Sequence, residues 1–176
     1  MSTPDEFITD YEDVSVYGLD PADERTMIDQ QDECTFVWTT ADGSPMAVIM
    51  SYLEKDGKFW LTASSQRKRI PAIRRDPRVA IVITSNGAPI GKSKTVTYKG
   101  TAVIHDDRDI KDWFYPALAE RIMGKFGQER VDLFAKFLDS PRRVVIEVTP
   151  GLRVAYDGVK KESATQRSVK AGVAWS

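Results

Sequence analysis

The chain has 176 residues, of which 41% are hydrophobic and 29% charged, and its formal net charge is −1 at pH 7. This length favours a single globular domain with short terminal extensions, because a domain typically occupies about 100–200 residues. No apolar run approaches the roughly 18 residues that cross a bilayer, and the acidic N-terminus lacks the basic-then-apolar order of a secretory signal. We therefore expect a cytoplasmic protein that binds no membrane.

Cysteine and histidine each occur once, as Cys34 and His105. A lone cysteine cannot form an internal disulfide, and together the two residues are too few soft ligands for a structural zinc site. Cys34 stands in a run of strand formers, which predicts a buried thiol, and His105 directly follows a predicted strand. We therefore expect no metal site, and the catalytic residues stay unknown.

Charge is distributed unevenly along the chain, since residues 1–33 hold eleven acids against Arg25 alone. We expect an acidic arm that is partly extended over a basic surface of its own chain or of a partner subunit, or else a solvated tail.

A basic cluster follows at residues 67–78. Its members are Arg67, Lys68, Arg69, Arg74, Arg75 and Arg78. Guanidinium and ammonium groups at this density suit a compact anion such as phosphate, and a solvated helix face is the alternative. The isoelectric point near 5.9 and the lack of a recognisable nucleic-acid module argue against a nucleic-acid partner.

The first half of the chain predicts a three-stranded meander, a short helix and a buried strand. Turn residues at 41–44 and 56–57 separate the apolar runs, and Ser64 and Ser65 offer N-cap hydroxyls to the helix. The expected elements are strands 34–40, 46–53 and 59–63, helix 66–75 and strand 79–83.

The second half predicts a strand, two helices and a closing hairpin. The first helix carries an apolar stripe and is kinked or restarted at Pro116, and Pro150-Gly151 is expected to turn the chain between the last two strands. The expected elements are strand 95–104, a helix from 109, helix 129–138 and strands 142–149 and 152–156. The polar and basic residues after 158 predict a tail that is disordered or reaches across a subunit boundary.

About six strands with few helices indicate a mainly β, α+β fold. We expect a six-stranded antiparallel barrel, because closure removes the edges that an open sheet would have to protect. Strand and helix do not alternate regularly, which disfavours a doubly wound parallel sheet.

The segment 87–93, Gly-Ala-Pro-Ile-Gly-Lys-Ser, is similar to a phosphate-binding P-loop but is one residue short. A strand rather than a helix follows it, so the amide donors that would cradle a phosphate are not aligned. We therefore reject a nucleotide triphosphate site and expect a surface turn or a mobile loop near a ligand.

Residues 59–79 read Phe-Trp-Leu-Thr-Ala-Ser-Ser-Gln-Arg-Lys-Arg-Ile-Pro-Ala-Ile-Arg-Arg-Asp-Pro-Arg-Val. This segment begins with a strand, which is followed by a hydroxyl-rich turn and the basic start of a helix. It ends with Asp-Pro-Arg-Val, which enters a buried strand. A Gly-x-Pro hairpin at 43–45 precedes them, and Lys-Gly-Thr-Ala at 99–102 comes after. Over roughly residues 25–157 this order resembles the flavin-binding split-barrel family related to pyridoxamine 5'-phosphate oxidase.

The resemblance implies a six-stranded split barrel that holds FMN, or alternatively the deazaflavin F420, against its second and third strands. By this resemblance, the residues that would bind the cofactor phosphate are Thr62, Ser64, Arg67 and Arg69, with Lys68 as a substitute cation. The residues that would border the cofactor ring are Met46, Ala47 and Val48. Hydroxyl and backbone donors at a helix start, reinforced by cations, independently make an anion site.

The resemblance also implies a homodimer that works as an oxidoreductase on a small organic substrate. The alternative is a non-catalytic protein that binds a flavin or haem on the same barrel. The substrate-binding C-terminal residues of a true pyridoxamine phosphate oxidase are not evident, so that reaction is not assigned. The expected organisation is an acidic arm at 1–24, a split-barrel cofactor-binding domain at 25–157 and a basic tail at 158–176.

Overall fold

The computed structural model describes residue 10 and residues 12–173. By its contacts the chain divides into two units. One, which we call the barrel unit, comprises Asp32–Val82 and Tyr98–Arg153. The other, the terminal unit, combines the described residues up to Gln31 with Ile83–Thr97 and with the described residues from Val154 onward.

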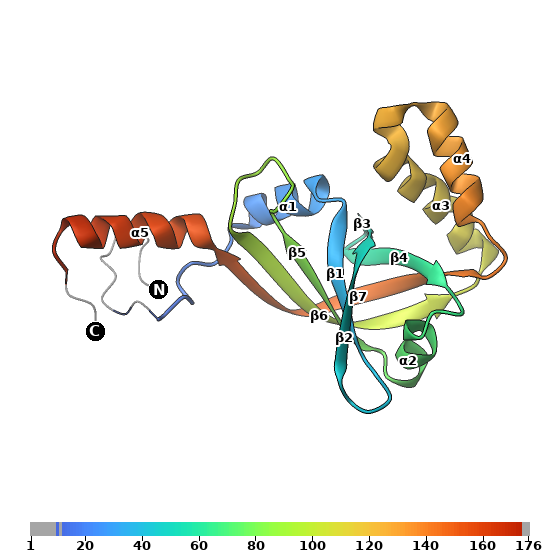
Figure 1. Ribbon diagram of the computed structural model, residues 1–176, viewed down its shortest axis with the longest axis horizontal. Helices are drawn as coiled ribbons and strands as arrows, with labels where there is room; N and C mark the ends of the chain where they lie inside the picture. The colour runs from blue at the N-terminus through green and yellow to red at the C-terminus, as the bar shows by residue number, and fades with distance from the viewer. Residues whose placement is uncertain (1–9, 11, 174–176) are drawn as a thin grey trace. The chain divides into compact units, whose positions relative to one another are not determined.

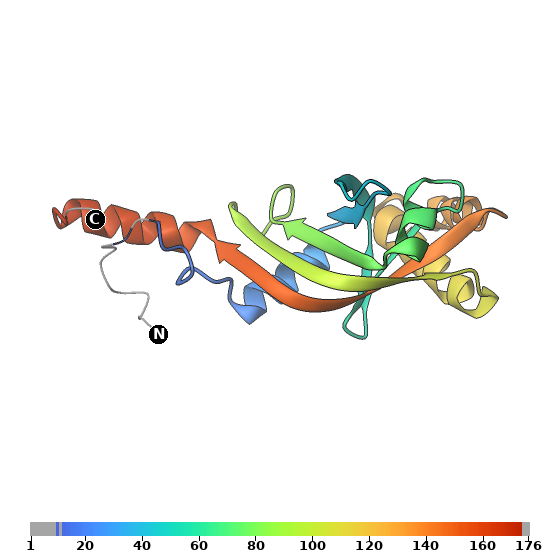
Figure 2. The ribbon, with the colours of Figure 1, turned by 90° about the horizontal axis from the view of Figure 1, so that it is seen from below.

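The strands form a seven-stranded sheet in the order β2-β1-β5-β6-β7-β4-β3 (Figure 1). Their bounds are β1 Glu33–Thr39, β2 Pro45–Ser51, β3 Leu53–Lys55, β4 Lys58–Ser64, β5 Arg78–Thr84, β6 Lys94–His105 and β7 Arg143–Asp157. The sheet is antiparallel and curls into a half-barrel, and Figure 2 shows its long strands β6 and β7 side by side. The α+β class is thus confirmed, whereas the expected count of six strands is not.

The core of the barrel unit is formed by side chains of β1, β4 and β5, along which buried and less buried residues alternate. In each of these strands every second side chain is buried, as in Phe36, Leu61 and Ile81, which are fully buried. A period of two places these residues on one face of the sheet. Helix α2, Arg69–Arg75, buries Ile70 and Ile73.

A helical hairpin packs over the other face of β4 and β7. It consists of α3, Arg108–Met123, a 3₁₀ turn at Gly124–Phe126, and α4, Gln128–Leu138. Phe114, Leu118 and Val131 form a second core there with Val145 of β7, and Trp60 of β4 packs against it. Among helices of the described residues, none is long and apolar enough to cross a membrane.

The single histidine belongs to a polar cluster on β4, β6 and β7. His105 Nε2 lies 3.0 Å from Glu147 Oε2, and Lys58 Nζ donates to Glu147 Oε1 at 2.5 Å. Burial by itself would raise the pKa of Glu147, but Lys58 and His105 outweigh it and lower that pKa. These residues tie three strands together.

This lowered pKa predicts acid-sensitive stability. The charged form of Glu147 is favoured in the folded protein, so its contribution is complete above the ordinary glutamate pKa of about 4.3 and is lost as pH falls through the lower folded pKa. In urea unfolding between pH 6 and pH 3, the stability gap between the wild type and Glu147→Gln should shrink with falling pH. Glu129→Gln, an exposed control on α4, should show no gap; a constant gap for Glu147→Gln would contradict the assignment.

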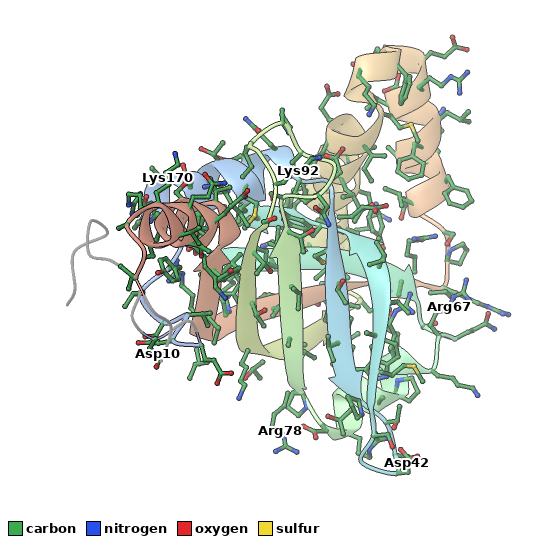
Figure 3. All side chains as sticks on the ribbon, turned by 60° about the vertical axis from the view of Figure 1, so that its left-hand side comes forward. Asp10, Asp42, Arg67, Arg78, Lys92 and Lys170 are labelled. Carbon is green, nitrogen blue, oxygen red and sulfur yellow. The ribbon has the colours of Figure 1, made fainter. Side chains whose placement is uncertain are left out.

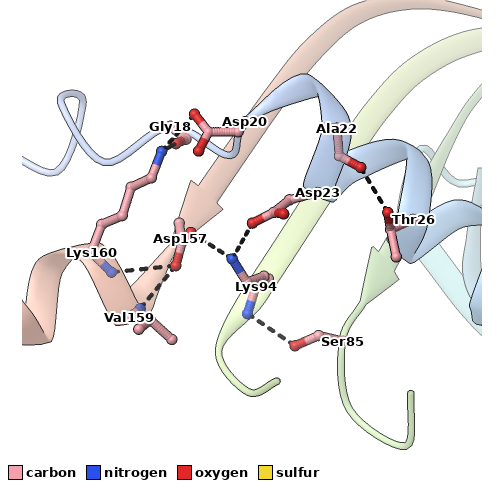
Figure 4. Close-up of polar contacts among 10 residues, drawn as sticks. All are labelled: Gly18, Asp20, Ala22, Asp23, Thr26, Ser85, Lys94, Asp157, Val159 and Lys160. Carbon is pink, nitrogen blue, oxygen red and sulfur yellow. Dashed lines mark hydrogen bonds and ion pairs between the residues drawn. The ribbon is translucent and has the colours of Figure 1, made fainter. Parts of the chain in front are cut away.

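In the terminal unit, α1 spans Pro21–Gln30 and α5 spans Gly158–Lys170. Lys94 of β6 donates to Asp23 of α1 at 2.6 Å and to Asp157 at 2.7 Å, as Figure 4 shows. The Asp157 side chain also accepts hydrogen bonds from the backbone amides of Val159 and Lys160, which caps α5.

The structure describes one helix near each end of the chain that the sequence analysis did not predict. Helix α1 was not expected in the acidic arm, and α5 was not expected in the basic tail. Pro21 at the first turn and the capping residue Asp157 explain both helices, because the ring of proline presets helical φ and the cap satisfies free amides. Residues 1–9 and 11 of the arm and 174–176 of the tail lie outside the described residues.

One expectation about the strands and one about helix α2 were also wrong. Pro150-Gly151 does not turn the chain, because β7 runs on without interruption from Arg143 to Asp157. The pairing of β4 with β7 extends only to Val148, so Pro150 stands where that neighbour has ended. Helix α2 begins at Arg69 after Lys68 as N-cap, without a hydroxyl cap, and Pro71 falls within its first turn, where proline is tolerated.

Candidate anion and cofactor site

The end of β4 supplies two hydroxyl groups on the half-buried face of that strand. Thr62 Oγ1 donates to the Val144 carbonyl at 2.8 Å, so its proton is already engaged. Ser64 Oγ accepts from the Gln66 amide at 3.4 Å and keeps its own proton for donation. Of the two predicted hydroxyls, Ser64 is therefore the better donor to an anion.

Three arginines surround this strand end, and we call them the arginine row: Arg67, Arg69 and Arg143. Arg67 is exposed in the turn after β4 (Figure 3), Arg69 opens α2, and Arg143 lies opposite Ser64 in the register between β4 and β7. Arg67 and Arg69 were predicted; Arg143 was missed. Its position depends on strand pairing with a segment far away in the sequence, so no local motif could have revealed it.

The arginine row has unsatisfied hydrogen-bonding capacity. The Nε atoms of Arg69 and Arg143 are buried and have no hydrogen-bond partner among the described residues. Burial lowers the pKa of each of these two arginines, and the nearby positive charge of Arg67 lowers both further. Within the part of the chain that the structure describes, no carboxylate forms an ion pair with any of the three.

A phenol group joins the arginine row from α3. The Tyr115 hydroxyl is buried beside the Thr62 hydroxyl, which lowers the pKa of Tyr115 through a hydrogen bond, but burial outweighs this effect and raises that pKa. The positive charge of Arg143 acts on this group. Unpaired buried donors such as the Nε atoms of Arg69 and Arg143 are rare in native proteins, and a site for an anionic group is a physical explanation for them.

Two of the three arginines of the arginine row lie against an aromatic ring. The Arg69 guanidinium lies 5.9 Å from the centre of the Trp38 ring, and the Arg143 guanidinium lies 5.4 Å from the centre of Phe137 on α4. Trp38 of β1 pairs in register with Met46 of β2. The structure therefore connects the predicted phosphate residues with the predicted ring-bordering strand through Arg69 and Trp38.

The remaining predicted residues lie on the surface. Met46 and Ala47 are exposed and Val48 is partly buried, although all three are apolar residues of a strand. Lys68 is exposed at the N-cap of α2. A hollow of about 490 Å³ opens beside this strand, with Trp38, Pro45 and Gly100 among its lining residues.

The other chemistry considered from the sequence finds no support at this site. The Cys34 thiol is buried, and burial raises its pKa to about 12, so it is a poor nucleophile at neutral pH. Among the described residues, no cluster of three histidine, cysteine or acidic side chains could hold a metal ion.

Similar structures share the fold at low sequence identity. A conserved hypothetical protein of Mycobacterium tuberculosis is 20% identical with a TM-score of 0.69, and the match covers 82% of this chain and 88% of that one. A structure described as F420 reductase is 18% identical with a TM-score of 0.57, over 74% and 94% of the two chains. The haem storage protein HutZ of Vibrio cholerae is 14% identical with a TM-score of 0.58, over 77% and 94%.

No curated protein matches the sequence. The family model described as pyridoxamine 5'-phosphate oxidase, however, matches residues 23–152, which is most of the chain and includes the strands and the turn that carry the arginine row. This chain therefore belongs to the pyridoxamine 5'-phosphate oxidase family.

Proposed function

We propose that the protein binds FMN and acts as a flavin-dependent oxidoreductase on a small organic substrate. The observation that carries the proposal is the arginine row, in which the buried Nε atoms of Arg69 and Arg143 have no hydrogen-bond partner among the described residues. A phosphate monoester brings a charge of about −1.5 to −2 at pH 7 and three strong acceptor oxygens, which match this set of donors.

The chain's own residues would bind and orient the cofactor. Arg67, Arg69 and Ser64 would donate to the phosphate, and Lys68 would add a positive charge from the surface. Met46, Ala47 and Val48 would border the ring and exclude water from it. FMN supplies the hydride or electron-pair chemistry when bound, so no catalytic acid or base is assigned to the protein.

The experiment that tests this function starts from the visible spectrum of the purified protein. FMN should bind with micromolar or lower Kd in a fluorescence-quenching titration, and NADH or NADPH should bleach the bound flavin, with an organic acceptor restoring its colour. Failure to bind either FMN or F420 at micromolar concentrations would remove the enzyme interpretation. Binding without reduction would instead identify a non-catalytic flavin-binding protein.

F420 is the second candidate cofactor, since a structural neighbour is described as an F420 reductase. Its phosphate suits the same arginine row, so parallel titrations with FMN and F420 decide between the two. Haem binding is less well supported at this site, because the chain's one histidine, His105, contacts Glu147 and not the arginine row.

We also propose a homodimer formed through β2. This strand ends the sheet, yet Met46 and Ile49 are 51% and 61% exposed and their neighbours Ala47 and Val48 are apolar. An uncovered apolar edge strand is a template for pairing with another chain, which soluble proteins normally avoid. A second copy would cover this strand and the ring that it borders.

The dimer predicts that Ile49→Glu is monomeric and binds FMN more weakly, because the charge would be buried at the interface. Light scattering coupled to gel filtration measures the mass directly. Leu133→Glu, at a residue of α4 that is 67% exposed, is the control and should remain dimeric. A monomeric wild type, or a dimeric Ile49→Glu variant with normal affinity, would show that β2 is not the interface.

A further inference from the structure

A second aromatic surface lies beside Arg143 of the arginine row. Phe137 of α4 is 63% exposed and stacks on Phe134, with ring centres 6.1 Å apart and planes inclined by 15°. The Arg143 guanidinium lies 5.4 Å from the Phe137 ring. We call Phe134 and Phe137 the phenylalanine shelf.

Two guanidinium groups lie against aromatic rings around the end of β4. Arg69 lies against Trp38, and Arg143 lies against Phe137. Arg67 is in the turn between β4 and α2, where its amide donates to the Ser64 carbonyl at 2.9 Å, and Ser64 is opposite Arg143 in the strand register.

A mononucleotide such as FMN would contact only some of these arginines and rings. Its single phosphate would engage Arg67 and Arg69, and its ring would lie toward Trp38 and β2. Arg143 and the phenylalanine shelf would keep their exposed faces. Asp139 lies two residues beyond Phe137. Arg108 Nη1 donates to Asp139 Oδ1 at 2.8 Å, so the negative charge of Asp139 is neutralised by Arg108.

We propose that the site accepts a flavin dinucleotide, with the diphosphate along the arginine row and the adenine on the phenylalanine shelf beside Arg143. The inference rests on the proposed flavin function and extends it. Two linked phosphates need more than one cation, and a nucleobase stacks on exposed aromatic side chains and on arginine. The flavin half would occupy the same place as FMN.

Calorimetric titration of the purified full-length protein with FAD and with FMN tests the proposal. FAD should bind at least about tenfold more tightly than FMN, which is the scale of one stacked base. Phe137→Ala should remove this advantage and change the affinity for FMN less than twofold. Phe137→Leu keeps the apolar volume without the aromatic face and should behave like Phe137→Ala.

Leu133→Ala is the matched control, because it removes an equally exposed apolar side chain from the same helix. It should leave both affinities unchanged. ADP, which carries only the diphosphate and adenine, should compete with FAD in the wild type and much less in Phe137→Ala.

The outcomes separate this inference from the function on which it rests. FMN binding with no preference for FAD would overturn the dinucleotide and leave the flavin function standing. If Phe137→Ala loses FMN and FAD affinity equally, the Phe137 ring contacts the mononucleotide part of the ligand, and the proposed adenine site on the phenylalanine shelf is wrong. Binding of neither flavin would overturn both proposals.

Discussion

Replacing Arg67 and Arg69 together with alanine is expected to weaken FMN binding by about 2–4 kcal/mol, or roughly 30-fold to 1,000-fold in Kd. A hydrogen bond to a charged group contributes about 1.5–3 kcal/mol, and two such groups on one phosphate overlap in effect. Fluorescence quenching by the titrated protein measures the loss. Arg74→Ala, an exposed arginine of the same helix, is the control and should bind normally.

Arg143, the third member of the arginine row, is expected to lower the stability of the cofactor-free protein. In the free protein the Arg143 guanidinium is partly desolvated, and its buried Nε has no partner among the described residues. Arg143→Met should therefore raise the stability of the cofactor-free protein by about 1 kcal/mol, or roughly 2–4 °C in Tm. A lower Tm for Arg143→Met would mean that Arg143 supports the fold instead of a ligand.

The second large effect is expected in the terminal unit. Lys94→Met should destabilise the protein by about 3–5 kcal/mol, because it leaves a buried carboxylate without its partner. The side chains of Lys94 and Asp157 are only 11% and 3% exposed. Burial by itself would lower the pKa of Lys94, but Asp157 and Asp23 outweigh it and raise that pKa, so the pair is charged at neutral pH.

Urea unfolding measures this loss, and two variants test its cause. Lys92→Met, two residues away and exposed, should change stability by less than about 0.5 kcal/mol. The double variant Lys94→Met with Asp157→Asn should recover part of the loss, because asparagine keeps the cap on α5 without the buried charge. A double variant less stable than Lys94→Met would show that the cap, and not the charge, dominates.

Local patterns in the sequence were sufficient for much of the barrel unit. Alternating burial in β1, β4 and β5 has a period of two and is visible in any short window. The apolar stripe of α3 likewise predicted a helix from about residue 109, and the structure has it from Arg108 to Met123 without a break at Pro116. The family resemblance, read from the order of motifs over residues 25–157, is confirmed by the match over 23–152.

Other features depend on residues far apart in the chain. Helix α1 has few apolar side chains, and its acidic composition is typical of a solvated tail. In the folded protein, Lys94 of β6 neutralises Asp23 of this helix. Strand β7 continues through Pro150-Gly151, where the local sequence favours a turn. In both cases tertiary partners outweigh a local preference that amounts to only a small free energy.

The sequence by itself determined the family, the antiparallel α+β class and the basic turn at residues 67–69, because each depends on neighbouring residues along the chain. Only the tertiary structure decided that Arg143, Tyr115 and Phe137 join that turn. They reach it through the register of β7 against β4 and through the helical hairpin above, and strand register is fixed by side-chain packing between distant segments.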